Sequence, residues 1–285
     1  MSVFLKCKDN TVSNEEFELV FHDQYDMLIT RPQPKKDKLG GYYKSENYIS
    51  HTDSNKTLID KVYQLVKKHT IKGKVNSINK YKRGGKQLLD IGCGTGEFLL
   101  SCKNDGWNVI GVEPNPDANA LTVAKIGDEN SIFKSLDDVI SLHSNTKFDV
   151  ITMWHVLEHV PNLEETVKNL SNLLTKNGVL LVAVPNFRSF DAVYYGEYWA
   201  AFDVPRHLWH FSRAAITDLF IKEGLKLSET RPMWFDSFYV SMLSETYKRG
   251  KSSFIRAFLI GFYSNCKGFF SNEVSSHIYF LKKVV

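Results

Sequence analysis

The chain has 285 residues, of which 43% are hydrophobic and 24% charged. This length is sufficient for one large globular α/β domain with additions, and the composition excludes a disordered or collagen-like chain. A formal net charge of +4 does not by itself indicate nucleic acid binding, and we find no apolar run of about 18 residues that predicts a membrane-spanning helix. No secretory signal is recognisable, and four scattered cysteines fit a reducing, cytoplasmic location.

The first elements predicted along the chain form a small β-hairpin. Residues 14–34 contain two β-rich runs, EFELVF and MLIT, separated by a polar turn. An aromatic, turn-rich segment follows at 39–53, and apolar residues at helical spacing predict a helix over 55–70. The basic run 66–86 carries much of the excess positive charge. We interpret it as a solvated loop rather than as a contact for RNA or a membrane.

The next part of the chain alternates between predicted strands and helices. Apolar runs predict four buried strands, at 88–91, 109–112, 148–153 and 179–184. The segments between them predict helices, at 96–106, 116–126 and 162–175. This alternation is typical of a parallel sheet covered on both faces. After residue 186 the pattern becomes irregular and aromatic, followed by a predicted helix over 212–224 and an amphipathic tail that ends in a strand-like run.

The most informative motif is LLDIGCGTGEF at 88–98. A buried strand ends in Asp90, and three glycines then form a turn at which a ligand can approach the backbone closely. A dinucleotide fingerprint would need another glycine at position 97, which is Glu, and Asp90 would repel a pyrophosphate. Glu113 ends the second strand, where an acid can accept the hydroxyl groups of a ribose. Together these features predict a pocket for S-adenosyl-L-methionine (SAM).

These motifs resemble those of the class I SAM-dependent methyltransferases. LLDIGCGTGEF is similar to the family's first motif and VIGVEP to its second, and FDVITMWHVLEHVPN and LLTKNGVLLVAVPN are similar to its fourth- and fifth-strand motifs. The chain is most similar to the group that includes the ubiquinone-biosynthesis O-methyltransferases. The resemblance implies an α/β fold with a Rossmann-like, doubly wound, seven-stranded sheet whose last strand is antiparallel. It also implies SAM as cofactor, bound by Asp90, Gly92, Cys93, Gly94, Glu113, Pro114, Leu136, Asp137, Trp154 and His155.

The segment WHVLEHV at 154–160 contains His155, Glu158 and His159 in the H-x-x-E-H order of some zinc peptidases. It follows a predicted strand and is ended early by Pro161, so a long helix carrying the three ligands is not expected. In the ubiquinone O-methyltransferases a divalent cation is associated with the corresponding segment, but here His155 stands where an acid is expected. We therefore assign no metal, and we interpret Glu158 and His159 as residues that orient the loop beneath the cofactor, with His159 kept as a third candidate base.

A second histidine cluster lies in YWAAFDVPRHLWHFS at 198–212. Transfer of a methyl group to a hydroxyl or amine requires loss of a proton, and histidine is the side chain that titrates nearest neutral pH. His207 is our first candidate base and His210 the second, although a structural role within an aromatic lid explains both equally well. Arg206 is a candidate on the substrate side, but an internal pair with Asp203 is favoured.

The N-terminal unit, residues 1–54, combines the hairpin with a segment expected to cover the cofactor. The hairpin resembles the second half of a zinc ribbon but has His22 and Tyr25 at cysteine positions, so we expect it to be metal-free. Three residues of the covering segment are candidates on the substrate side: Tyr43, Tyr48 and His51. Residues 55–285 form the predicted SAM-binding methyltransferase domain, with a lid at 187–212 and a helical insertion at 236–272.

Taken as a whole, the sequence predicts a SAM-dependent methyltransferase that acts on a small-molecule acceptor by in-line displacement, with an oxygen nucleophile favoured. The alternative is a catalytically silent SAM-binding module that serves as a sensor or partner. Nucleic acid is not favoured as a partner. Membrane contact through the aromatic tail is a weaker expectation, and the sequence is compatible with a monomer or a homodimer.

Overall fold

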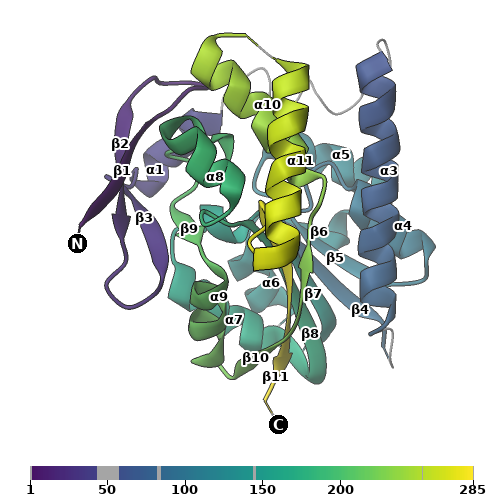
Figure 1. Ribbon diagram of the computed structural model, residues 1–285. Helices are drawn as coiled ribbons and strands as arrows, with labels where there is room; N and C mark the ends of the chain where they lie inside the picture. The colour runs from purple at the N-terminus through teal and green to yellow at the C-terminus, as the bar shows by residue number, and fades with distance from the viewer. Residues whose placement is uncertain (1, 44–57, 82–84, 144–145, 252, 285) are drawn as a thin grey trace.

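A seven-stranded sheet forms the centre of the computed structural model, which describes residues 2–43, 58–81, 85–143, 146–251 and 253–284 (Figure 1). The strand order is β10-β11-β8-β7-β4-β5-β6. Strands β4 to β8 pair in parallel, whereas β11 is antiparallel to both of its neighbours. This confirms the predicted fold class. The strands are β4 (Gln87–Ile91), β5 (Asn108–Val112), β6 (Ile132–Phe133), β7 (Phe148–Trp154), β8 (Leu174–Pro185), β10 (Leu225–Pro232) and β11 (Ser276–Lys283).

Helices cover both faces of this sheet, because successive residues of a strand point to opposite sides. Leu88, Val150 and Leu181 face one core, which also contains residues of α3 (Leu58–Asn79), α4 (Glu97–Asn104) and α5 (Pro116–Ile126). Leu89 and Ile151 face the other core. That core is shared with α6 (Leu136–Leu142), α7 (Leu163–Leu173) and α9 (Arg213–Ile221). The strands and helices predicted between residues 88 and 224 are confirmed to within a few residues, except at the start of β8.

Helix α3 corrects the interpretation of the basic run 66–86 as a loop. The helix continues to Asn79, and Val75 and Ile78 are buried against the sheet. The prediction was wrong because the high lysine content was taken to indicate a loop. The apolar residues between the lysines recur at helical spacing and form the buried face of a helix. This helix matters for the site, because its middle turns face the cavity described below.

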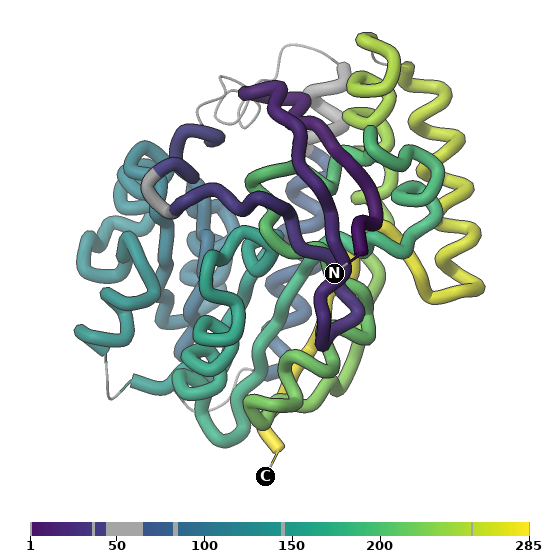
Figure 2. Tube along the Cα trace, turned by 90° about the vertical axis from the view of Figure 1, so that its left-hand side faces the viewer, coloured from purple at the N-terminus to yellow at the C-terminus, as the bar shows by residue number. Residues whose placement is uncertain are grey.

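The N-terminal hairpin is part of a separate four-stranded antiparallel sheet with the order β1-β2-β3-β9 (Figure 2). The two predicted strands are β2 (Glu16–Phe21) and β3 (Met27–Arg31), whereas β1 (Val3–Lys8) was not predicted. The fourth strand, β9 (Trp209–Phe211), belongs to the lid segment 187–212 and pairs with β3. The lid is therefore joined to the N-terminal unit by backbone hydrogen bonds. The short helices α1 (Lys36–Leu39) and α8 (Phe190–Tyr195) lie in the N-terminal unit and in the lid segment.

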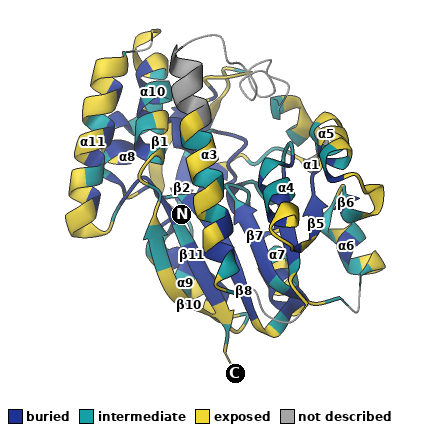
Figure 3. Cartoon of the chain, turned by 90° about the vertical axis from the view of Figure 1, so that its right-hand side faces the viewer, coloured by how far each residue is buried: buried dark blue, intermediate teal, exposed yellow. Residues whose placement is uncertain are grey.

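Two helices occupy the insertion between the last two strands. Helix α10 (Asp236–Arg249) follows β10, and α11 (Phe254–Ser271) leads into β11. In the view of Figure 3 the outer side of α11 is coloured as exposed along most of its length, whereas the central strands of the sheet, such as β7 and β8, are coloured mainly as buried. Among the described residues, no helix is both long and apolar enough to cross a membrane.

Candidate functional site

A cavity of about 520 Å³ lies at the carboxyl ends of β4, β5 and β7. In doubly wound sheets this edge is where ligands bind. Six of the predicted cofactor residues line the cavity: Asp90, Gly92, Cys93, Gly94, Glu113 and Trp154. Helices α3 and α10 complete its wall, with Lys74 and Asp236 among the residues they contribute. The sequence analysis predicted the residues at the strand ends that form the floor of this cavity, but it did not predict that α3 and α10 close the cavity.

Four other predicted cofactor residues do not line this cavity. Leu136 packs against the hydrophobic core instead, and Asp137 lies in the first turn of α6, where a negative charge suits the helix dipole. Pro114 lies between Glu113 and the start of α5, outside the cavity lining. His155 points to two carboxylates, as described below. The expected contacts of these four residues with SAM are therefore not supported by the geometry.

Asp90 is the acidic residue at the base of the cavity. It is the fourth residue of β4 and only 1% exposed, and its Oδ1 accepts a hydrogen bond of 2.6 Å from the Thr152 hydroxyl. Burial raises the pKa of Asp90 to about 7, and the Thr152 hydrogen bond and the nearby Lys74 charge oppose this shift only in part. A cationic ligand would stabilise the ionised carboxylate, so the site is suited to a positively charged group.

Two glycines of the turn have left-handed backbone angles, and they differ in what lies beside them. Gly92 has φ +70°, and a Cβ built on it would lie 2.3 Å from a methyl group of Val156. Gly94 has φ +57°, but nothing lies within 4 Å of its Cβ position. Because Gly94 also lines the cavity, its bare backbone leaves room for a ligand.

Glu113 is held in place by two backbone amides. One carboxylate oxygen accepts a hydrogen bond of 2.9 Å from Gly94 N–H, and the other accepts one of 2.9 Å from Asn115 N–H. Burial raises the pKa of Glu113, and these two hydrogen bonds oppose the shift. Each oxygen keeps a further lone pair for a ligand hydroxyl. The fixed carboxylate at the end of β5 therefore fits the ribose-binding role expected from the sequence.

Lys74 is a cavity residue that the sequence reasoning missed. Its Nζ lies 4.3 Å from the centre of a Trp154 ring. Burial lowers the pKa of Lys74, while the charges of Asp90 and Asp236 oppose this shift. The helical spacing of the apolar residues around it was the signal that would have placed Lys74 on a helix. SAM carries a carboxylate as well as cationic groups, and a lysine ammonium in the cavity is a suitable partner for that carboxylate.

Replacing Lys74 by Met is expected to weaken SAM binding about tenfold, because the carboxylate of the ligand loses a charged partner. The substitution keeps most of the apolar stem. Isothermal titration calorimetry with SAM measures the effect, and Lys168→Met, on the exposed side of α7, is the matched control. Equal affinities of the wild type and Lys74→Met would show that this amine does not contact the ligand.

His155 connects the cavity to a second group of polar residues. Its Nε2 lies 3.1 Å from Asp236, and its Nδ1 lies 3.4 Å from Glu158. The backbone at His155 has φ +58°, an uncommon value for a non-glycine residue. Although burial opposes it, the nearby carboxylates of Asp236 and Glu158 raise the pKa of His155 to about 10. His155 is therefore an imidazolium between two carboxylates near neutral pH.

The raised pKa of His155 predicts how stability depends on pH. Because the folded pKa is near 10 and the unfolded pKa is about 6.5, the stabilisation is full below about pH 6.5 and is lost as the pH rises towards 10. His155→Gln is expected to lower the Tm by about 2 °C near pH 6, for a loss of about 1 kcal/mol, and by less near pH 10. Thermal unfolding of wild type, His155→Gln and the control His143→Gln across this range provides the test. A difference that is constant with pH would contradict it.

Glu158, His159 and His207 form a buried cluster beside His155. One ligand-type atom from each lies within 4.8 Å of the other two. The His159 and His207 rings meet edge to face with centroids 4.6 Å apart. Glu158 is 1% exposed, and neither of its carboxylate oxygens has a hydrogen-bond partner in the described part of the chain, although His155 lies within ion-pair distance. The sequence did not predict that the two histidine motifs would meet.

Hydrogen bonds assign a tautomer to each of the two cluster histidines. The Nδ1 atom of His159 lies 3.0 Å from the Arg206 carbonyl, and that of His207 lies 2.8 Å from the Ala201 carbonyl. Since a carbonyl can only accept, each Nδ1 carries a hydrogen. Burial and the neighbouring His207 lower the pKa of His159 to about 4, so its ring is neutral near pH 7. The Nε2 atom of His159 therefore keeps a lone pair.

His210 is used differently. The Thr30 hydroxyl donates to the His207 carbonyl at 2.6 Å, so the Thr30 oxygen accepts from His210 Nε2 at 2.9 Å. Burial, together with His207, lowers the pKa of His210 well below its ordinary value. These contacts hold β9 of the lid against β3. The geometry favours the structural interpretation of His210 over its role as a second candidate base.

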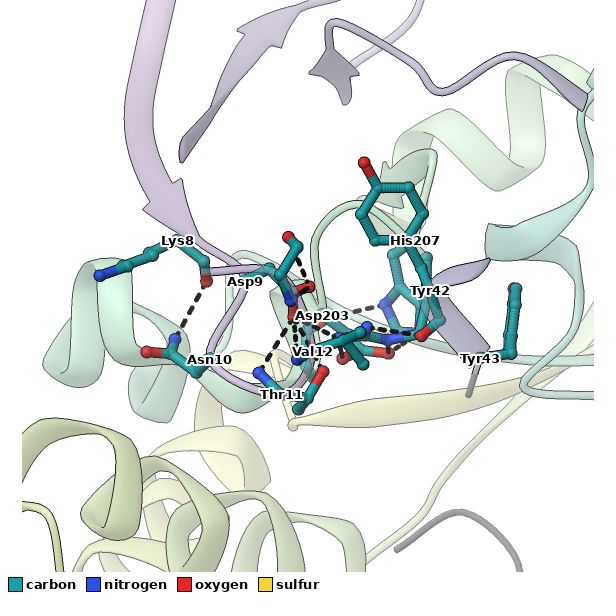
Figure 4. A network of polar contacts seen from close by, with 12 residues as sticks. Lys8, Asp9, Asn10, Thr11, Val12, Tyr42, Tyr43, Asp203 and His207 are labelled. Atoms are coloured by element: carbon teal, nitrogen blue, oxygen red, sulfur yellow. Dashed lines mark hydrogen bonds and ion pairs between the residues drawn. The ribbon is translucent and has the colours of Figure 1, made fainter. Parts of the chain in front are cut away.

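Arg206 is held in an internal network, part of which is seen in Figure 4. Its guanidinium donates to Asp203 at 2.6 and 3.0 Å, to Asp9 at 3.1 Å and to the Tyr42 carbonyl at 3.0 Å. The favoured internal pair with Asp203 is therefore present. The assignment of Arg206 to the substrate side is corrected, because its side chain is only 6% exposed and its donors point inwards.

Of the three substrate-side candidates in the N-terminal unit, the structure describes Tyr43. The Tyr43 hydroxyl oxygen lies 2.9 Å from His159 Nδ1, so this residue reaches the histidine cluster. Tyr48 and His51 lie outside the described residues. In the hairpin, His22 Nδ1 accepts from the Gln24 and Tyr25 amides and stabilises the turn between β2 and β3.

The cluster of Glu158, His159 and His207 also has the composition of a divalent cation site. A carboxylate and two imidazoles are suitable donors, and neither carboxylate oxygen of the buried Glu158 has a hydrogen-bond partner among the described residues. The neighbouring His155 imidazolium already supplies one such charge. The residues present therefore fit a cation, which the sequence analysis held possible at Glu158 and His159 but did not favour; His207 was not among the residues considered for it.

Comparison with known proteins places these features in a family. Residues 63–230, more than half of the chain, match the family model described as a methyltransferase domain. The ubiquinone biosynthesis O-methyltransferase of Glaesserella parasuis is 36% identical over 111 residues, covering 36% of this chain and 46% of that protein. The protein of the same name from Rickettsia canadensis is 26% identical over 160 residues, covering 53% and 66%. The chain thus spans about half the length of the curated relatives it matches.

Solved structures agree with the fold. The cyclopropane synthase MmaA2 from Mycobacterium tuberculosis superposes with a TM-score of 0.54 at 15% identity, covering 89% of this chain and all of that chain (100%). The magnesium protoporphyrin IX methyltransferase from Synechocystis, solved with bound SAM, gives 0.54 at 14% identity and covers 88% and 99%. The glycine turn, the acid after β5 and the extent of the family match show that the chain belongs to the methyltransferase-domain family, with the fold of the class I SAM-dependent enzymes.

Proposed function

We propose that the protein transfers the methyl group of SAM to an oxygen atom of a small-molecule acceptor. The observation that carries this proposal is the 520 Å³ cavity, in which the buried Asp90 carboxylate, the open backbone of Gly94 and the fixed Glu113 carboxylate lie together. A carboxylate with a pKa near 7 suits the cationic part of SAM, and an anchored carboxylate suits its ribose.

The acceptor is proposed to bind where segment 154–159 borders the cofactor cavity, so that its oxygen can reach the methyl carbon of SAM directly. Trp154 lines the cavity, whereas His159 belongs to the buried cluster, and His155 contacts residues of both. Tyr43 reaches the same cluster from the N-terminal unit. This arrangement brings the lid and the N-terminal unit to one acceptor site, and it excludes water from the reaction.

An oxygen nucleophile is supported by the histidine pair. A hydroxyl must lose its proton as its oxygen forms a bond to the methyl carbon and the carbon–sulfur bond breaks. The lone pairs on Nε2 of His159 and His207 can accept this proton, leaving neutral S-adenosylhomocysteine and an imidazolium. Relatives matched over about half their length carry the name ubiquinone biosynthesis O-methyltransferase, which supports the same atom class.

The same cluster offers a second way to activate the acceptor. Glu158, His159 and His207 would hold a divalent cation, and a bound cation would lower the pKa of an acceptor hydroxyl. The protein's own contribution is the same in both cases: the three side chains orient the acceptor oxygen and keep the site dry.

The proposal is tested in two steps. Calorimetry with SAM and S-adenosylhomocysteine measures cofactor binding, and transfer of radiolabelled methyl groups from SAM to a panel of phenols, catechols, carboxylates and amines measures turnover. Binding of SAM followed by labelling of hydroxyl acceptors is the expected result. Binding without labelling of any acceptor would favour the silent binding module, and labelling of amines alone would contradict the oxygen nucleophile.

A further inference from the structure

Helix α11 has its large apolar residues on the outside. Its buried face consists of small residues: Ala257, Gly261, Ser264 and Gly268. The outer face, here called the α11 apolar face, is formed by Phe254, Ile255, Phe258, Leu259, Phe262 and Phe269, which are 50–73% exposed. This is the reverse of a helix that packs a large apolar stripe against a core. In Figure 3 the exposed side of α11 faces away from the rest of the molecule.

Close packing on the inner side fixes the direction of this face. A Cβ added to Gly261 would lie 2.9 Å from the Phe238 ring, and one added to Gly268 would lie 2.4 Å from a methyl group of Val274. The small residues therefore allow α11 to approach α10 and the start of β11 closely. A helix held this way cannot rotate to bury its aromatic side chains, so these remain available to a partner.

The charged residues within segment 246–272, which contains α11, have one sign. Residues 246–272 contain no Asp or Glu and five basic residues: Lys248, Arg249, Lys251, Arg256 and Lys267. Lys267 and Lys248 lie over tyrosine rings, and Arg249 is tied to the buried Glu245. An exposed aromatic stripe in a segment whose charged residues are all cations is the pattern of a helix that lies in the surface of an anionic bilayer.

We propose that the α11 apolar face docks the protein on the surface of a lipid bilayer with anionic headgroups. The aromatic side chains would enter the boundary between headgroups and acyl chains, and the flanking cations would meet phosphate groups. A second copy of the chain is a poorer occupant, because a two-fold contact would bring both sets of five cations together. The contact is peripheral, since none of the described helices meets the requirements for crossing a membrane. The proposal does not depend on the identity of the methyl acceptor.

Vesicle sedimentation of the full chain tests the proposal. Vesicles of phosphatidylcholine alone and of equal parts phosphatidylcholine and phosphatidylglycerol serve as probes at low and high salt. We expect binding to the anionic vesicles, weakened by salt. Phe258→Ser with Phe262→Ser should reduce the apparent partition constant at least about tenfold, and Lys251→Glu with Lys267→Glu should reduce it comparably. Leu142→Ser, at a position 71% exposed on α6, is the matched control and should bind like the wild type.

Two measurements keep the result interpretable. Because the substituted side chains are exposed, all variants should keep the wild-type circular dichroism spectrum and melting profile, and SAM binding in solution should be unchanged. Failure of the wild type to sediment with anionic vesicles, or equal sedimentation of the serine variant, would overturn the proposal. So would light scattering that shows a wild-type dimer converted to a monomer by the serine substitutions, since that result would assign the face to a second copy.

Discussion

Replacing Asp90 by Asn is expected to weaken SAM binding about 10- to 100-fold, because a buried charge-assisted contact is worth about 1.5–3 kcal/mol. Asn has nearly the shape of Asp and can still accept the hydrogen bond from Thr152, which is 2.6 Å long in the wild type. The substitution therefore removes charge with little change in packing. Calorimetry with SAM at fixed pH measures the loss.

The pH dependence of binding gives a sharper test of the same residue. In the free protein burial raises the pKa of Asp90 to about 7, and the cation binds better to the ionised form. Below pH 7 the carboxyl must first lose its proton, so the affinity for SAM should fall by up to about tenfold per pH unit, and it should level off above pH 7. Asp90→Asn has no proton to lose at this position and should show a nearly flat profile between about pH 5.5 and 7.5.

Asp218→Asn on the exposed side of α9 is the matched control, because it removes one carboxylate far from the cavity. It should leave both the affinity and its pH profile unchanged. If Asp90→Asn bound SAM as tightly as the wild type, or kept the wild-type pH profile, Asp90 would not face the cationic part of the ligand.

The parts of this site that were predictable from sequence are those built by neighbouring residues. Asp90, the glycine turn and Glu113 lie on two consecutive strand ends, and a parallel sheet places consecutive strand ends side by side. Because these residues are close in the sequence and follow adjacent parallel strands, their relative positions could be predicted from the sequence. The same reasoning predicted the order of buried strands and covering helices, because hydrophobic periodicity is a local signal.

The parts that were missed depend on contacts between distant segments. Lys74 reaches the cavity because α3 packs across the strand ends, and Asp236 reaches it because the insertion after β10 folds back. Likewise, β9 joins the N-terminal sheet by pairing with β3, and no local sequence pattern predicts this pairing. Leu136 is a different case, since similarity to a motif suggested a cofactor contact for a side chain that is partly buried and packs against a core.

His155 shows that a residue that departs from the family motif can still position the groups on either side of it. An acid was expected at this site, and the imidazolium found there has the opposite charge. It pairs with Glu158 inside the cluster and with Asp236 on the cavity wall, so one side chain fixes both groups. His155 thus fixes the cluster relative to the cofactor cavity, and an in-line displacement requires such fixed positioning of an acceptor oxygen against the methyl carbon.

His207→Gln and His159→Gln are each expected to lower methyl transfer about 100-fold or more, because general-base catalysis contributes roughly 10²–10⁴-fold. Glutamine can still donate to the Ala201 or Arg206 carbonyl but offers no basic nitrogen, so the lid should remain in place. The affinity for S-adenosylhomocysteine should stay within about twofold of the wild type, since neither histidine lines the cofactor cavity. His143→Gln, at the end of α6, is the control.

The combined variant separates a shared role from two independent ones. If both rings serve one proton transfer, His159→Gln with His207→Gln should be little slower than the slower single variant, because residues that act as a unit are not additive.

Transfer should also persist in EDTA, since the His155 imidazolium already balances the Glu158 carboxylate. Loss of transfer in EDTA, restored by Mg²⁺ or Mn²⁺, would assign the cluster to a cation instead. Single variants with full transfer rates would show that both histidines are structural.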